Sequence, residues 1–115
     1  MIKIFVSQPM SKFTDDEIRE NRQRAIEMIK VYFESEGESD TQVIDNMQSA
    51  NEEFEKAKHT NLKYLGIDIS ALADADIAFF MNGWEDARGC RIEKLCCDES
   101  DIPVIFEKDI SEKEN

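Results

Sequence analysis

The chain has 115 residues, a length that fits one domain with a single modest core. Its composition, 41% apolar and 35% charged with four glycines and two prolines, excludes fibrous and low-complexity classes. The net charge of −12 opposes binding to DNA or RNA polymers, which depends on Lys and Arg neutralising phosphates, but leaves single nucleotides open as ligands.

Two further absences narrow the class of protein. No apolar run approaches the roughly 20 residues of a membrane span, and the first residues lack the pattern of a secretory signal. We therefore expect a cytoplasmic protein without a membrane partner.

Cys90, Cys96 and Cys97 match neither a disulfide framework nor a common zinc spacing, so we interpret them as reduced, mostly structural thiols. His59 stands alone in a polar segment, and we expect no metal site and no cofactor.

The first third of the chain predicts a strand, a loop and a helix. Residues 2–6 are apolar and β-branched and lead into a polar loop at 7–11, which indicates a strand that ends there. Thr14 and Glu17 have the spacing of a capping box. Apolar residues recur at helical spacing after them, so we expect a helix from Asp15 to Glu34.

The middle of the chain is more polar. Residues 42–45 form a short second strand in our interpretation, with Asp45 at its carboxyl end. Residues 46–60 are acidic, and we expect an excursion that covers one side of a cleft and is partly helical from Ala50 to Lys58. A stripe of apolar residues then predicts a second core helix that ends near Ala75. The stripe consists of Leu62, Leu65, Ile69 and Leu72.

The last third continues the alternation of strands and helices. The continuous apolar run 77–81 is typical of a strand buried on both faces. A helix is expected from Arg88 to Ser100, and Pro103 indicates that the last strand, 102–106, lies at an edge. The inward residues of that helix are expected to be Ile92, Leu95 and Cys96. We expect one compact α/β domain over residues 1–107, with three layers and a parallel sheet, followed by a charged tail over 108–115 with little to bury.

Ligands of parallel α/β sheets bind outside the carboxyl ends of the strands, which makes residues 83–93 the expected site. Carboxylates brought together in a dry site have pKa values pushed apart, so that one can act as a nucleophile while another delivers a proton. Glycosidic bond cleavage requires that division of roles. In a chain with 26 acidic residues, however, some fall near any cleft by chance. The candidates are Asp45, Asp68, Glu85, Asp86 and Glu93.

Individual residues in this stretch have alternative interpretations. Glu93 lies one turn after Gly89, near the start of a helix whose dipole favours negative charge, although a structural first-turn Glu would look the same. Gly89 would let a substrate approach the following backbone amides. Trp84 could stack on a nucleobase, or it could seal the core or a dimer interface. Arg88 and Arg91 are candidates for phosphate, although pairing with a neighbouring acid is the commoner fate of such a residue.

Three segments of the chain resemble the nucleoside 2-deoxyribosyltransferase superfamily. They are Ile-Phe-Val-Ser-Gln-Pro-Met at 4–10, Asp-x-x-x-Leu-x-x-Ala-Asp at 68–76 and Gly-x-x-x-Glu at 89–93. The run Gly-Trp-Glu-x-x-Arg-Gly-Cys-Arg-Ile-Glu at 83–93 is similar to the signature of a branch of small bacterial and phage proteins. The resemblance covers most of residues 1–107.

The resemblance implies a flavodoxin-like sheet in the order 2-1-3-4. It also implies N-glycosidic bond cleavage or base exchange on a 2′-deoxynucleoside or its 5′-monophosphate, with Glu93 as the nucleophile that forms a glycosyl ester and Asp68 as acid/base. The partners would be a nucleoside or nucleotide and further copies of this chain, in a homodimer or larger homo-oligomer. The expected substrate-binding residues are Ser7, Gln8, Asp45, Gly83, Trp84, Glu85, Asp86, Arg88, Gly89 and Arg91.

Two positions depart from the family pattern. The tyrosine that many members carry on the first strand is replaced by the Ile4–Phe5 region, unless Tyr64 supplies the hydroxyl. The serine that phosphate-preferring members place two residues before the glycine is Ala87. A binding module of the same fold without catalysis is therefore the alternative hypothesis. A small α/β protein with merely solvated carboxylates is the third.

Overall fold

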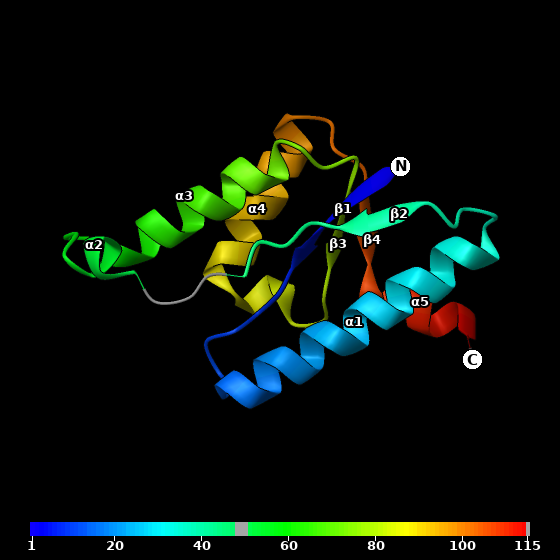
Figure 1. Ribbon diagram of the computed structural model, residues 1–115, viewed down its shortest axis with the longest axis horizontal. Helices are drawn as coiled ribbons and strands as arrows, with labels where there is room; N and C mark the ends of the chain where they lie inside the picture. The colour runs from blue at the N-terminus through cyan, green and yellow to red at the C-terminus, as the bar shows by residue number, and fades with distance from the viewer. Residues whose placement is uncertain (48–50, 115) are drawn as a thin grey trace.

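The computed structural model describes residues 1–47 and 51–114. Within these residues four strands form one parallel sheet in the order β2-β1-β3-β4 (Figure 1). The strands are β1 (Ile2–Ser7), β2 (Thr41–Val43), β3 (Ile77–Phe80) and β4 (Val104–Phe106). The predicted fold class, a flavodoxin-like three-layer α/β sandwich with strand order 2-1-3-4, is confirmed.

Helices cover both faces of this sheet. α1 and α5 contribute to the apolar cluster on one face, whereas α3 and α4 contribute to the cluster on the other. The helices are α1 (Asp15–Ser35), α2 (Glu52–Glu55), α3 (Thr60–Leu72), α4 (Arg88–Glu99) and α5 (Glu107–Glu114), with a short 3-10 turn, η1 (Trp84–Asp86), before α4. In the described part of the chain, no helix combines the length and the apolar content needed to cross a membrane.

The alternation of side chains along β1 decides which residues face which helices. Ile4 and Val6 are fully buried against α1 and α5, and Phe5 is buried in the cluster with α3 and α4. Because successive side chains of a strand point to opposite faces, Ser7 lies on the same face as Phe5. The last residue of the central strand therefore turns its hydroxyl toward the layer that contains α4.

Local sequence signals account for most element boundaries. The capping box at the start of α1 is confirmed: the Glu17 amide donates to the Thr14 hydroxyl at 3.2 Å and the Thr14 amide donates to the Glu17 carboxylate at 2.9 Å. The strand expected at 77–81 is central and buried, and β4, which follows Pro103, is an edge strand. The second strand is shorter than expected and ends at Val43.

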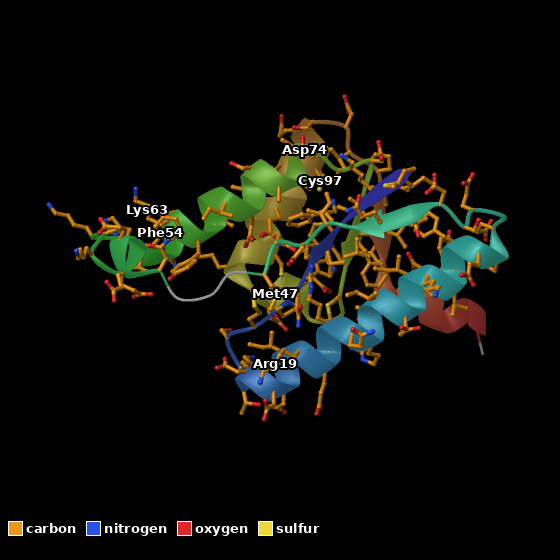
Figure 2. All side chains as sticks on the ribbon, viewed as in Figure 1. Arg19, Met47, Phe54, Lys63, Asp74 and Cys97 are labelled. Carbon is orange, nitrogen blue, oxygen red and sulfur yellow. The ribbon has the colours of Figure 1, made fainter. Side chains whose placement is uncertain are left out.

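The segment between β2 and α3 contains α2, which lies within the stretch expected to be partly helical. The first residue of that stretch, Ala50, falls among residues 48–50, outside the described residues. Figure 2 shows Phe54 of α2 and Lys63 of α3 at the end of these two helices that lies away from the sheet. Phe54 packs edge-on against Tyr64 there, with ring centroids 5.2 Å apart. Because this end of α3 extends past the sheet, Leu62 is 57% exposed, and its expected place in the core was wrong.

The prediction of which residues of α4 face the core was also partly wrong. Leu95 is 59% exposed, whereas the buried residues of this helix are Cys90, Glu93 and Cys97. The buried face of α4 is thus one on which two thiols flank a carboxylate. A pattern search that follows only large apolar side chains chooses the wrong face, because the small thiols and the carboxylate are what this helix buries.

The expected charged tail forms α5 instead. Ile110 is only 2% exposed and belongs to the core cluster with β1 and α1. Glu107, at the start of α5, is buried because both of its carboxylate oxygens have partners: the Asn82 amide donates to one at 3.0 Å and Arg24 of α1 donates to the other at 2.7 Å. One apolar residue and one satisfied carboxylate are enough to dock this short charged helix.

Candidate functional site

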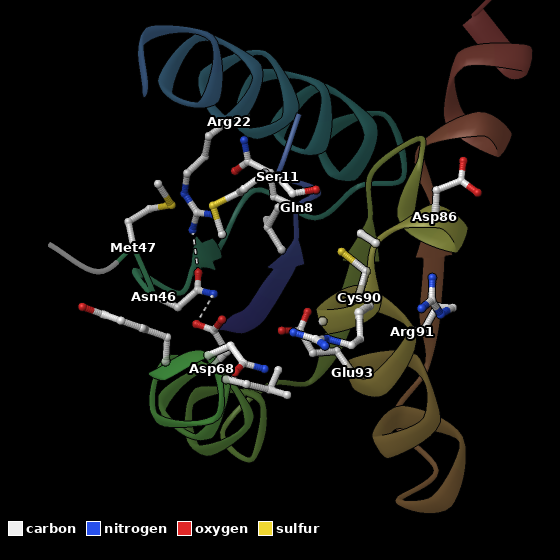
Figure 3. A pocket seen from close by; sticks show the side chains of 18 residues that line it. Gln8, Ser11, Arg22, Asn46, Met47, Asp68, Asp86, Cys90, Arg91 and Glu93 are labelled. Carbon is white, nitrogen blue, oxygen red and sulfur yellow. Dashed lines mark hydrogen bonds between the residues drawn. The ribbon is translucent and has the colours of Figure 1, made fainter. Parts of the chain in front are cut away.

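A cavity of about 670 Å³ lies beside the carboxyl end of β1, between α1, α3 and the start of α4 (Figure 3). Its volume is in the range of small-molecule binding sites. Asp68 from α3 and Glu93 from α4 both line it. The two carboxylates that the sequence singled out as catalytic candidates therefore border one cavity.

Glu93 is buried at the sheet side of this cavity. Only 4% of the residue is exposed, and the Ser7 hydroxyl donates a hydrogen bond of 2.7 Å to its Oε1 atom. Burial raises the pKa of Glu93 to about 7; the Ser7 hydrogen bond opposes this rise and the charge of Asp68 adds to it. At neutral pH the carboxyl group is thus divided between its protonated and ionised forms.

Asp68 is less buried and is held by a chain of hydrogen bonds. The Asn46 amide nitrogen donates to Asp68 Oδ1 at 3.3 Å, and Arg22 Nη2 donates to Asn46 Oδ1 at 2.9 Å and to the Ile44 carbonyl at 3.0 Å. Burial raises the pKa of Asp68, while the Asn46 hydrogen bond and then the charge of Arg22 lower it. Burial likewise lowers the pKa of the Arg22 guanidinium.

The two carboxylates therefore have different surroundings within the same space. Figure 3 shows Arg22, Asn46 and Asp68 along one side of the cavity, with Cys90 and Glu93 on the other. The first side carries a positive charge, whereas the second has a hydroxyl and a thiol. Pairs of titratable groups whose surroundings differ in this way can divide the roles of acid and nucleophile.

Several expected binding residues also line the cavity: Gln8, Asp86, Arg88, Gly89 and Arg91. Ser7 acts from beneath it, through Glu93. The Arg91 guanidinium donates to the Glu85 carbonyl at 2.9 Å, so part of its capacity is used within the loop that precedes α4.

Four expected binding residues lie outside this cavity. Asp45 is exposed beyond the end of β2, and its carboxylate accepts from the Met47 amide at 3.3 Å. The three residues Gly83, Trp84 and Glu85 line a second, smaller hollow of about 370 Å³ on the other side of their loop.

Trp84 packs as part of the hydrophobic core beside that second hollow. Its ring stacks on Phe106 with centroids 5.5 Å apart and an interplanar angle of 23°, and it meets Phe80 edge-on. Of the roles considered from the sequence, sealing the core agrees with this position, whereas stacking on a base in the main cavity does not. Gly83 turns the chain here with a φ of +92°, a conformation that suits glycine.

The hydroxyl that contacts Glu93 comes from Ser7. Tyr64 lines the cavity, but its hydroxyl accepts from the Asn51 amide at 2.9 Å and donates to Glu55 at 3.0 Å. The Tyr64 hydroxyl therefore connects α3 to α2 and its N-cap residue, and it does not take the place of the missing tyrosine beside Glu93.

Three residues of the site were not found from the sequence: Arg22, Asn46 and Cys90. Arg22 follows the helical spacing of Ala25 and Ile29, which marks it as a residue of the buried face, but a charged side chain is commonly assigned to solvent. Cys90 also lines the cavity, and burial raises the pKa of its thiol to about 11, so it is neutral at pH 7 and a weak nucleophile.

The described residues contain no group of three or more His, Cys, Asp or Glu side chains that could hold a metal ion. Comparison of the chain with protein-family models, with curated proteins and with solved structures gives no match. The chemistry of the cavity is therefore interpreted from its own residues.

Proposed function

We propose that the protein cleaves the N-glycosidic bond of a 2′-deoxynucleoside or deoxynucleoside 5′-monophosphate and passes the sugar to water or to another base. The observation that supports this proposal is that Glu93 and Asp68 line one cavity of nucleoside size. Their spacing in the sequence also resembles that of the nucleoside 2-deoxyribosyltransferase superfamily.

The proposed reaction has two steps. The Glu93 carboxylate attacks C1′ of the sugar and the C1′–N bond breaks. The electron pair of that bond goes to the base nitrogen, which takes a proton that Asp68 delivers. In the second step, Asp68 accepts a proton from water or from the incoming base, which attacks C1′ and releases Glu93. The elevated pKa of Asp68 suits a group that must carry this proton.

The elevated pKa of Glu93 sets a condition on this mechanism. A nucleophile must be ionised, and with a pKa of about 7 only part of the Glu93 population is ionised at pH 7. The Ser7 hydroxyl favours the ionised form, and the positive charge that develops at C1′ in the transition state does the same. The rate should therefore rise with pH through about 7.

The test is base release from a panel of deoxynucleosides and their 5′-monophosphates, followed by chromatography, with and without a second base as acceptor. Glu93→Gln should abolish release, while Glu99→Gln, a change at an exposed position of the same helix, should not. Acid-quenched wild-type protein should carry the mass of one deoxyribosyl group on the peptide that contains Glu93. Equal release by wild type and Glu93→Gln would refute the assignment.

A non-catalytic nucleotide-binding module is the second candidate. The observation that favours it is that Tyr64, the candidate for the missing tyrosine, uses its hydroxyl on the Asn51 amide and on Glu55 and not on Glu93. Ligand binding raises the melting temperature of a protein whether or not chemistry follows. Stabilisation by a nucleotide with no product after long incubation would favour binding alone. The family resemblance further implies a homo-oligomer, which sedimentation analysis would test.

A further inference from the structure

We propose that Gln8 and Arg22 form a subsite for the base, and that it selects bases with a ring carbonyl beside a ring N–H, such as hypoxanthine and uracil. This inference rests on the proposed function, because it assigns the leaving group of that reaction. It depends on the unused hydrogen-bonding capacity of two buried side chains in the same cavity.

Gln8 has a buried acceptor without a partner. The residue is 7% exposed, and its Nε2 donates to the Ile18 carbonyl at 2.8 Å, which fixes which end of the amide is which. Its Oε1 is buried and accepts no hydrogen bond from residues 1–47 or 51–114. Buried polar atoms normally have partners, and Gln8 lines the cavity, so a donor on a bound ligand is the partner that suits this oxygen.

Arg22 has donors that its own hydrogen bonds do not use. It is 8% exposed, and both of its hydrogen bonds come from Nη2, to the Ile44 carbonyl and to Asn46. Among the described residues, neither Nε nor Nη1 donates to any acceptor. A guanidinium carries only donors, so the partner that it lacks is an acceptor such as a carbonyl oxygen.

The position of Arg22 and Gln8 corresponds to the leaving base. Asp68, which protonates that base in the proposed reaction, is joined to Arg22 through Asn46 on the same side of the cavity (Figure 3). With the sugar between Glu93 and Asp68, the base extends toward Arg22 and Gln8. A lactam edge then fits both side chains, since its oxygen accepts from Arg22 and its N–H donates to Gln8.

Amino-substituted bases do not fit this pair. Adenine and cytosine place an unprotonated ring nitrogen where the lactam has its N–H, so two lone pairs face each other at Gln8 Oε1. Their exocyclic amino group also meets the Arg22 guanidinium, donor against donor. Substrates that leave buried polar groups of a site unpaired are rejected strongly.

Two matched pairs of nucleosides test this selectivity: deoxyinosine against deoxyadenosine, and deoxyuridine against deoxycytidine. The members of each pair differ at the proposed edge of the base. We expect kcat/KM for base release to be about 10- to 100-fold higher for the oxo member of each pair. Gln8→Met, which removes the acceptor, should reduce this ratio toward one, while a change at an exposed arginine of α1 that pairs with Asp16, Arg19→Gln, should leave it unchanged. Equal rates within both pairs in the wild type, or faster release from the amino members, would overturn the inference.

A binding measurement separates this inference from the proposed function. Calorimetric titration of Glu93→Gln with the same four nucleosides requires no turnover. We expect the oxo members to bind about tenfold or more tightly than their amino partners, and Arg22→Lys, which keeps the charge but loses the planar donors, to weaken the preference. Selective binding without base release by the wild type would refute the enzyme but support the subsite. Release without selectivity, or no binding by any of the four, would refute the subsite.

Discussion

The buried carboxyl group of Glu93 should make the stability of the protein depend on pH, and Glu93→Gln isolates that dependence. Burial raises the pKa of this group from its ordinary value of 4.5 to about 7. Between these two pH values the folded protein keeps a proton that the unfolded chain has lost. The free energy of unfolding therefore falls as pH rises through this range, at about 1.4 kcal/mol per pH unit and by about 3 kcal/mol in total.

Glutamine at this position keeps the size of the side chain and the oxygen that accepts from Ser7, but it does not titrate. The stability of Glu93→Gln relative to the wild type should consequently increase by about 3 kcal/mol between pH 4.5 and pH 8. Urea unfolding followed by the fluorescence of Trp84, the single tryptophan, measures this difference, because that ring lies against Phe80 and Phe106 in the core. Groups that do not interact with Glu93 titrate alike in both proteins and cancel in the comparison.

The control is Glu99→Gln, at an exposed position of α4, whose stability relative to the wild type should vary little over the same pH range. A difference between Glu93→Gln and the wild type that stays constant from pH 4.5 to pH 8 would refute the reasoning. It would mean that Glu93 ionises in the folded protein as readily as in the unfolded chain.

Three other substitutions test the site and the fold. Ser7→Ala removes a hydrogen bond to the ionised form of Glu93, so the acid limb of the pH–rate profile for base release should move up by about one pH unit. Asn46→Ala removes a hydrogen bond to the ionised form of Asp68, so the alkaline limb of the same profile should move up. Glu107→Ala leaves the backbone amide at the start of the loop to α4 without its acceptor, and urea unfolding should give a loss of about 1–3 kcal/mol.

The parts of the fold that were predictable depend on neighbouring residues in the sequence. The run 77–81 is apolar at every position because β3 is covered on both faces, and the capping box at Thr14 marks the start of α1 wherever that helix packs. The docking of α5 was not predictable in this way. Its charged residues outnumber its apolar ones, and its burial depends on Arg24 and the Asn82 amide, which accommodate Glu107 from distant parts of the chain.

The candidate site was predictable to a similar extent. The rule that ligands bind at the carboxyl ends of parallel strands, together with the spacing of the family motif, identified Asp68 and Glu93, and both line the cavity. The rule predicts that a loop lies at that edge of the sheet, but it does not predict to which side the loop turns. The position of Trp84, which packs against Phe106 and does not line the cavity, was therefore not predictable. Asn46, one residue beyond the expected Asp45, contacts Asp68 because β2 ends at Val43.

In the proposed reaction, the charges around the cavity affect how the two carboxylates divide their roles. Burial raises the pKa of both groups; an amide and a guanidinium oppose this rise at Asp68, and a single hydroxyl opposes it at Glu93. Nucleophilic attack by Glu93 therefore requires that the sugar, as it becomes positive at C1′, draws the ionised form to itself. The two groups titrate as a pair, and the same singly protonated pair is the active form whichever group attacks, so the pH–rate profile does not identify the nucleophile. A deoxyribosyl group on the peptide that contains Glu93 after acid quenching assigns the attack to Glu93, whereas the same mass on the peptide that contains Asp68 assigns it to Asp68.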